Sequence, residues 1–178
     1  GIVQAGCLAW NARSRPDLQT AQTALPGMCD SPAQAEALLA LGRIENGWIS
    51  EDRNHSVNRW LLRDNPLALR MELERVGPDL LQQGLKEIHA IRETLDPRDD
   101  ADPRPSVSRD LRLACDFCEC AYRRGLFHLG SNDGRGLASS IQALIGRFES
   151  DWLLRFRPGG LAESAGHLRD TLQSLLRR

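Results

Sequence analysis

The architecture of this chain follows from residues 106–130, SVSRDLRLACDFCECAYRRGLFHLG. Apolar side chains recur there every three or four positions, which places them on one face of an α-helix. Ser106 or Ser108 can cap the start of the helix, and Gly130 can end it. The members of the apolar face are Leu111, Cys115, Cys118, Tyr122, Leu126 and Leu129. The stretch therefore predicts a long amphipathic helix at the centre of the domain.

The same spacing continues toward the C-terminus. Ser-Asn-Asp at 131–133 leads into a second helix that stops at Pro158, and a third begins at about Leu161. The apolar faces of these two helices are Leu137, Ile141, Leu144, Ile145, Phe148, Trp152 and Phe156, then Ala165, Leu168, Leu172 and Leu175 or Leu176. Long helices joined by short turns favour an up-and-down antiparallel bundle, so the predicted fold class is all-α.

Further helices are predicted on the N-terminal side. Ser31-Pro32 supplies an N-cap and a proline at the first helical position, so 33–44 should be helical. Shorter helices are expected at 57–63 and from Pro66 to Val76. Gly77-Pro78-Asp79 starts a longer helix that should end near Leu95. Residues 96–105 are rich in Asp, Arg and Pro, which is typical of a solvated connection.

The first ten residues, GIVQAGCLAW, differ from the rest. They form a short apolar run with two glycines and no helical period, which suits a buried strand. A buried strand needs a partner for its backbone groups, and no later segment offers one. We therefore divide the chain into a strand remnant and linker at 1–14, severed from the sheet or barrel of a larger protein, and a helical domain at 15–178.

Composition limits the class of protein and its partners. With 41% apolar residues, 26% charged residues and a net charge of -1, the chain is typical of one globular domain. No apolar run approaches the roughly 18–20 residues that span a bilayer. Binding to nucleic acid needs a clustered basic excess, and acidic residues cancel it here. We expect neither a membrane nor a nucleic-acid partner, whereas oligomerisation stays open.

The cysteine pattern and the start of the chain bear on location. Five cysteines are an odd number and lack the spacing of a disulfide scaffold, which favours a reducing compartment. The expected location is the cytoplasm. The first residues also lack the charged region and cleavage pattern of a signal peptide.

The sequence offers weak signals for chemistry, and each has a simpler interpretation. Cys115, Cys118 and Cys120 contain zinc-ligand types, but on a helix Cys120 points away from the other two. Gly130–Gly136 resembles a phosphate-binding loop but lacks the P-loop lysine, so a helix-to-helix turn is favoured. The acid pair Asp99-Asp100 sits in a solvated loop, and the histidines are scattered singly. We therefore predict no catalytic residue, no metal ligand and no cofactor in this chain.

The turn at 157–161, RPGGL, is predicted to be a hinge between the last two helices. Pro158 disfavours helical backbone at the preceding residue and cannot donate a hydrogen bond, so the helix ends there. Gly159 is expected to take the positive φ that reverses the chain, and Gly160 to act as the N-cap of the last helix. The expected consequence is strain when Gly159 is replaced.

Two segments resemble a known family. Residues 148–164, FESDWLLRFRPGGLAES, are similar to the C-terminal helical end of bacterial proteins related to glycoside hydrolase family 20, the β-N-acetylhexosaminidases. The most specific part is Trp-x4-Arg-Pro-Gly-Gly-Leu, Trp152 to Leu161. Residues 54–62, NHSVNRWLL, are similar to a helix start that follows the barrel in such proteins. The resemblance covers roughly residues 40–178.

The resemblance implies a TIM barrel beside which this helical domain packs. Gly6 to Trp10 would be the last barrel strand, and Trp10 the candidate sugar-binding residue, although Asn11 stands where the family commonly has glycine. The family's catalytic Asp-Glu pair has no counterpart here, so the chain alone would not be an enzyme. The parent would remove terminal N-acetylhexosamine residues from a carbohydrate, using the substrate's own acetamido group. The alternative is a free-standing helical binding or oligomerisation module.

Overall fold

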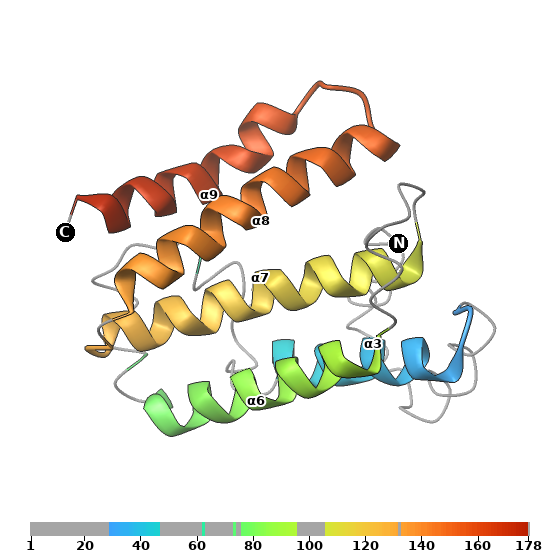
Figure 1. Ribbon diagram of the computed structural model, residues 1–178, viewed down its shortest axis with the longest axis horizontal. Helices are drawn as coiled ribbons and strands as arrows, with labels where there is room; N and C mark the ends of the chain where they lie inside the picture. Colours follow the sequence, from blue (N-terminus) through green and yellow to red (C-terminus); the bar gives the residue numbers. More distant parts are fainter. Residues whose placement is uncertain are drawn as a thin grey trace, which may run out of the picture.

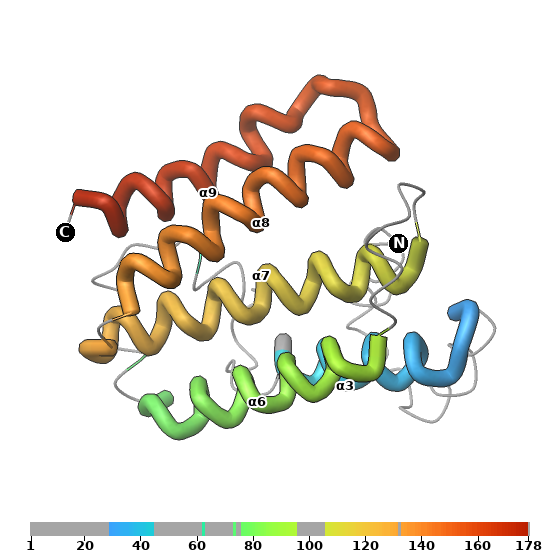
Figure 2. Tube along the Cα trace, in the orientation of Figure 1, coloured from blue at the N-terminus to red at the C-terminus, as the bar shows by residue number. Residues whose placement is uncertain are grey.

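The computed structural model describes residues 29–46, 62, 73, 76–95, 106–131 and 133–177. In this part of the chain five α-helices form: α3 (Pro32–Asn46), α6 (Pro78–Thr94), α7 (Val107–His128), α8 (Gly134–Arg155) and α9 (Leu161–Leu176). They stack in layers, with α9 and α8 on one side of α7 and with α6 and α3 on the other (Figure 1). Each of these five helices runs in the direction opposite to the described helix before it (Figure 2). The predicted all-α, up-and-down antiparallel bundle is confirmed.

Several sequence-based predictions fall outside the described residues. These are the N-terminal strand remnant, the boundary between 14 and 15, and the connection at 96–105. Of the two short helices expected at 57–63 and 66–76, the described residues are Leu62, Leu73 and Val76, each of which is helical. Leu62 and Leu73 belong to the hydrophobic core. Among the described helices, none combines the length and apolar content that a bilayer crossing requires.

The predicted helix starts are found where the caps indicated. The Ser31 hydroxyl accepts a hydrogen bond from the backbone N–H of Gln34 at 3.3 Å, and the Ser106 hydroxyl accepts one from that of Arg109 at 3.1 Å. Such bonds satisfy backbone donors that have no partner within the helix. Of the two candidate caps of α7, Ser106 is therefore the cap. Ser108 is instead buried and accepts a bond from Gln34 Nε2 at 2.8 Å.

Helix α7 is the centre of the core. The predicted face is buried at Leu111, Cys115, Cys118 and Tyr122, but Leu113, Cys120 and Ala121 on other sides are also 3% exposed or less. The reason is its position, because α7 packs on α6 and α3 as well as on α8. A helix enclosed in this way needs no polar stripe.

Buried polar side chains fasten α7 to the chain around it. The Tyr122 hydroxyl donates to the carbonyl oxygen of Ile44 at 3.2 Å, at the end of α3. Arg112, 8% exposed, donates from Nη2 to the carbonyl oxygen of Leu95 at 2.5 Å, just beyond α6. Buried polar groups are tolerated when they are hydrogen-bonded, and here the bonds also set the position of α7 along its neighbours.

The hinge between α8 and α9 is present, and Gly160 is the N-cap of α9 as predicted, but the predicted positive φ at Gly159 was wrong. Helix α8 ends at Arg155, and Phe156 is extended. The residue with positive φ is Gly160, at φ 82° and ψ -12°, which is also the N-cap of α9, whereas Gly159 does not have positive φ. One residue therefore both reverses the chain and starts the next helix. Sequence reasoning had divided these two roles between neighbouring glycines.

We expect Gly160→Ala to destabilise the domain by about 1 kcal/mol, because alanine is strained in left-handed backbone. A Cβ at Gly159 would meet nothing within 4 Å, so Gly159→Ala is the matched control and should leave stability unchanged or slightly raised. Chemical denaturation of both variants measures the difference. Two coincident unfolding curves would show that the left-handed turn does not constrain the sequence.

Candidate functional site

The one site residue suggested by the sequence, Trp10, lies outside the described residues. The described part of the chain offers three other features with chemical potential. These are the buried cysteines of α7, a network of charged side chains over α6, α7 and α8, and an apolar surface at the end of α8.

The cysteines of α7 are core residues. Cys115, Cys118 and Cys120 form no disulfide and are 0%, 1% and 3% exposed. Burial raises the pKa of the Cys115 thiol to about 11 and that of Cys120 to about 12. A thiol of such high pKa is a poor nucleophile and a poor metal ligand at neutral pH. Within the described residues no group of three or more His, Cys, Asp or Glu side chains could hold a metal ion.

We expect Cys115 and Cys120 in the folded protein to react with iodoacetamide at pH 8 on the order of a hundredfold more slowly than after denaturation. The expected cause is the raised pKa, which leaves little thiolate, together with the lack of access. Peptide mass mapping of the alkylated protein measures each site. The half-buried Cys29 is the internal control and should be alkylated first. Equal native rates at Cys29 and Cys120 would contradict this account.

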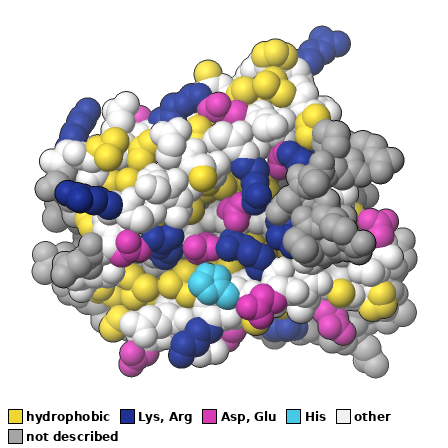
Figure 3. Space-filling view, in the orientation of Figure 1, with side chains coloured by type: hydrophobic (Ala, Val, Ile, Leu, Met, Phe, Trp, Pro, Cys, Tyr) yellow, Lys and Arg dark blue, Asp and Glu magenta, His cyan; other side chains and the backbone are white. Residues whose placement is uncertain are grey.

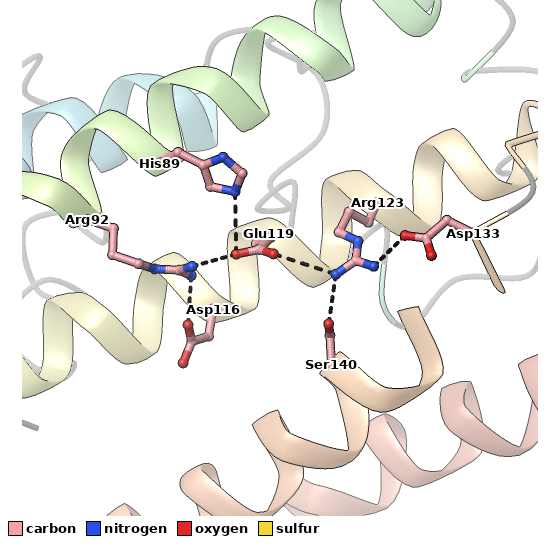
Figure 4. Close-up of polar contacts among 7 residues, drawn as sticks. All are labelled: His89, Arg92, Asp116, Glu119, Arg123, Asp133 and Ser140. Carbon is pink, nitrogen blue, oxygen red and sulfur yellow. Dashed lines mark hydrogen bonds and ion pairs between the residues drawn. The ribbon is translucent and has the colours of Figure 1, made fainter. Parts of the chain in front are cut away.

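A network of charged side chains links α6, α7 and α8 (Figure 4). Arg92 on α6 binds Asp116 and Glu119 on α7, each at 2.7 Å. Asp116 also pairs with Arg147 on α8. The chain of contacts continues from Glu119 to Arg123 at 3.6 Å. Three helices are thus joined through side chains on α7.

The far end of the network reaches the start of α8. Arg123 pairs with Asp133, the residue before α8, and donates to the Ser140 hydroxyl at 2.7 Å. On the other side His89, whose side chain is 55% exposed, lies 3.7 Å from Glu119. The network contains three guanidinium groups, three carboxylates and this imidazole. Its charges compensate one another, so it does not form a site of one sign for a charged ligand.

The acidic centre of the network is a structural group. Burial raises the pKa of the Asp116 carboxyl from its ordinary value, although the Arg147 and Arg92 guanidiniums act in the opposite direction. The native carboxyl therefore holds its proton to a higher pH than the unfolded chain does. The stability linked to this proton is present at low pH and is lost as the pH rises through the native pKa. Asp116 joins α6 and α8 to α7 through its ion pairs with Arg92 and Arg147.

Two more ion pairs cross between α7 and α8 near the end of the bundle. Asp151 is 4% exposed. Its Oδ1 lies 2.5 Å from Nε and 2.5 Å from Nη2 of Arg109. Asp110 pairs with Arg155. Each pair joins the first turn of α7 to the last turns of α8. We call these four residues the α7–α8 clasp.

The remaining predicted motifs are structural where they are described. In the segment 130–136 Gly130 ends the turn after α7 at φ 104°, the Asp133 carboxylate pairs with Arg123, and Gly134 begins α8, as expected for a helix-to-helix turn. His89 is at the surface, while His128 and His167 are half-buried. His55, Asp99 and Asp100 lie outside the described residues.

Trp152 and Gly160, two defined positions of the Trp152–Leu161 motif, shape the hinge. The Trp152 indole donates from Nε1 to the carbonyl oxygen of Arg157 at 3.1 Å, across the hinge. Arg155 belongs to the α7–α8 clasp, and Gly160 takes the left-handed conformation. The Trp152 ring also lies between the rings of Phe148 and Phe156 and is tilted against both, with centroid distances of 5.7 Å and 5.0 Å. The motif therefore specifies the hinge.

An apolar surface stands out beside this hinge. Leu153, Leu154 and Phe156 are 52%, 43% and 49% exposed, and we call them the α8 end surface. Apolar side chains gather over the turn between α8 and α9, while acidic and basic side chains alternate across the middle of the same face (Figure 3). Three neighbouring exposed apolar side chains are a candidate interaction site.

Sequence reasoning missed the network and the clasp. Only Glu119 and Arg123, four residues apart on one helix, carry a local signal for an ion pair. The other partners lie on different helices, so their pairing depends on the tertiary structure.

Comparison with known proteins gives no relative: no protein-family model, no curated sequence and no solved structure matches this chain.

Proposed function

We propose that this chain is a non-catalytic helical domain that packs beside the TIM barrel of a protein related to the family 20 glycoside hydrolases. The observation that carries the proposal is the structural use of the motif on which the resemblance rests. Trp152 donates a hydrogen bond across the hinge to the Arg157 carbonyl, and Gly160 reverses the chain. A motif used for shaping a turn is compatible with a supporting domain.

In this proposal the chemistry belongs to the parent protein. The parent would release terminal N-acetylhexosamine from a carbohydrate, with the catalytic Asp-Glu pair on a barrel strand outside this chain. Trp10 would contribute an aromatic face to the sugar site, since ligands bind at strand ends of open barrels. The free thiols of the described cysteines support a reducing, cytoplasmic location.

The experiment compares the chain with the polypeptide encoded by the complete gene, using a chromogenic N-acetylglucosaminide. We expect turnover by the complete polypeptide and none above buffer by this chain. In the complete polypeptide Trp10→Ala should lower kcat/KM by about tenfold or more while leaving the melting temperature nearly unchanged, because it removes one sugar contact. Turnover by the isolated chain, or inability of the complete polypeptide to bind the sugar, would refute the proposal.

A second candidate is a free-standing binding or oligomerisation module. The exposed α8 end surface favours it, since a second protein could cover these side chains. Sedimentation of the purified chain separates the two candidates, because a self-associating module gives a mass above that of the 19.8 kDa chain.

A further inference from the structure

Three polar contacts between α7 and α8 recur at a regular interval. On α7 the participating residues stand seven positions apart and alternate in charge, positive, negative and positive. This interval keeps them on one stripe of the helix. On α8 their partners follow in descending order, because the two helices are antiparallel (Figure 2). We call these contacts the α7–α8 ladder: Arg109 with Asp151, Asp116 with Arg147, and Arg123 with Ser140.

The turn before α8 does not by itself decide how the two helices pair. Residues 130–136 contain three glycines, at 130, 134 and 136, and glycine accepts the positive φ that such a turn needs. The structure uses Gly130, at φ 104°. A turn moved from Gly130 to Gly134 would lengthen α7 and shorten α8 by four residues. Every facing partner would then change by about eight positions, which is close to one heptad.

The apolar face of α8 tolerates such a displacement. Leu137 and Leu144 are seven positions apart, and so are Ile141 and Phe148. A slide of one heptad therefore replaces each apolar side chain of a pair by the other. The first three are buried in the core, and Phe148 packs against it. Apolar packing thus distinguishes the two registers less sharply than charge does.

The charges of the α7–α8 ladder do distinguish the registers. In the observed register Arg147 faces Asp116, the one acidic member of the α7 stripe. A slide of one heptad brings Arg147 opposite Arg123 in one direction and opposite Arg109 in the other. Either displaced hairpin therefore sets two guanidiniums against each other and removes Arg147 from Asp116. The side chains of Asp116 and Arg147 are 23% and 35% exposed, so water screens such charges only in part.

We infer that the α7–α8 ladder is a conformational device that selects the turn at Gly130 and excludes the hairpins displaced by one heptad. Alternating charges at a helical interface act in this way by making the wrong registers repulsive. Arg147 is the selecting residue, because it would meet an arginine in both displaced hairpins. The ladder consists of residues of this chain alone, so its role is independent of the proposed function.

The test is Arg147→Glu in the full chain, which inverts the selection. The new carboxylate would face Asp116 in the observed register and an arginine in either displaced hairpin. We expect a second set of backbone NMR signals, populated to about 10% or more. In that set the Cα chemical shifts of Ser131 and Asp133 move to helical values, because both residues lie inside a helix once the turn has moved. A single set of signals with the native turn would overturn the inference.

Two control variants separate charge repulsion from simpler causes. Arg147→Met removes the attraction without creating a repulsion, so its second population should be smaller than that of Arg147→Glu. Arg169→Glu reverses the same charge in the Glu149 pair between α8 and α9, and it should keep the single native set. Equal second populations in Arg147→Met and Arg147→Glu would overturn the inference, because the loss of the arginine would then suffice.

A double variant decides the outcome if Arg147→Glu does not fold. Combining it with Asp116→Arg restores opposite charges at this contact in the observed register. We expect the double variant to fold and to regain the native signals of the turn. A double variant as unfolded as Arg147→Glu would overturn the inference, since charge pairing at this contact would not explain the loss.

Discussion

Replacing Gly84 by alanine is expected to destabilise the domain by about 1–2 kcal/mol, although alanine is the better helix former. Gly84 is buried on α6 against the ring of Tyr122 on α7. An added Cβ would lie 2.8 Å from Tyr122 Cδ1 and nearer still to Cε1. The ring cannot swing away easily, because it is 2% exposed and its hydroxyl is bound to the Ile44 carbonyl. The clash therefore outweighs the gain in helix propensity, which is about 1 kcal/mol.

The matched control is Gly146→Ala on α8, where an added Cβ meets nothing within 4 Å. This substitution should stabilise the domain by about 0.5–1 kcal/mol, since only the propensity term remains. Urea denaturation of both variants gives the two free energies of unfolding. In a double-mutant cycle Tyr122→Leu should remove much of the penalty at Gly84. If Gly84→Ala were as stabilising as Gly146→Ala, close approach of α6 and α7 would not depend on this glycine.

Much of the secondary structure could be predicted because its signals are local. The serine caps, the prolines at helix starts and the period of apolar residues lie within a few residues of the features they determine. They gave the helices α3, α6, α7, α8 and α9 to within a few residues. The up-and-down order then followed from the shortness of the turns around Gly130 and Pro158.

The surroundings of α7 could not be predicted in the same way. Its periodic face indicated one buried side, but Leu113 and Cys120 are buried too because helices pack on more than one side. Arg112 is 8% exposed although arginine is rarely buried. The buried guanidinium donates a hydrogen bond to the carbonyl oxygen of Leu95. Leu95 is 17 residues away in the sequence, so no local pattern predicts this contact.

The hinge shows a second limit of sequence reasoning. Two adjacent glycines are equally able to adopt positive φ, and the choice depends on how α9 packs on α8. The glycine with positive φ is Gly160. A Cβ added to Gly160 would lie 3.7 Å from the Trp152 ring. The candidate interaction surface was likewise hidden, because the sequence had assigned Phe156 to an apolar helix face and the structure leaves it 49% exposed.

Asp151→Ala is expected to destabilise the domain by on the order of 2–3 kcal/mol, because it removes the carboxylate that the half-buried Arg109 guanidinium contacts. The Arg109 and Asp151 side chains are 14% and 4% exposed, and two guanidinium nitrogens lie 2.5 Å from Asp151 Oδ1. Breaking such a pair costs more than the pair itself contributes, since the remaining charge stays desolvated. The expected loss is smaller than the roughly 3–5 kcal/mol of a fully buried pair, because the Arg109 side chain is 14% exposed and retains some access to water.

The contrast is provided by Glu149→Ala on the same helix. Glu149 pairs with Arg169 of α9, and these side chains are 30% and 46% exposed, so the change should cost less than about 1 kcal/mol. Added salt should weaken the Glu149 pair more than the Asp151 pair, because buried charges are screened less.

The double variant Arg109→Met with Asp151→Leu should recover most of the lost stability, since it removes both charges and keeps apolar packing. Denaturation curves of the three variants test this sequence of effects. Equal losses for Asp151→Ala and Glu149→Ala would mean that the clasp behaves as a surface ion pair and does not fasten α8 to α7.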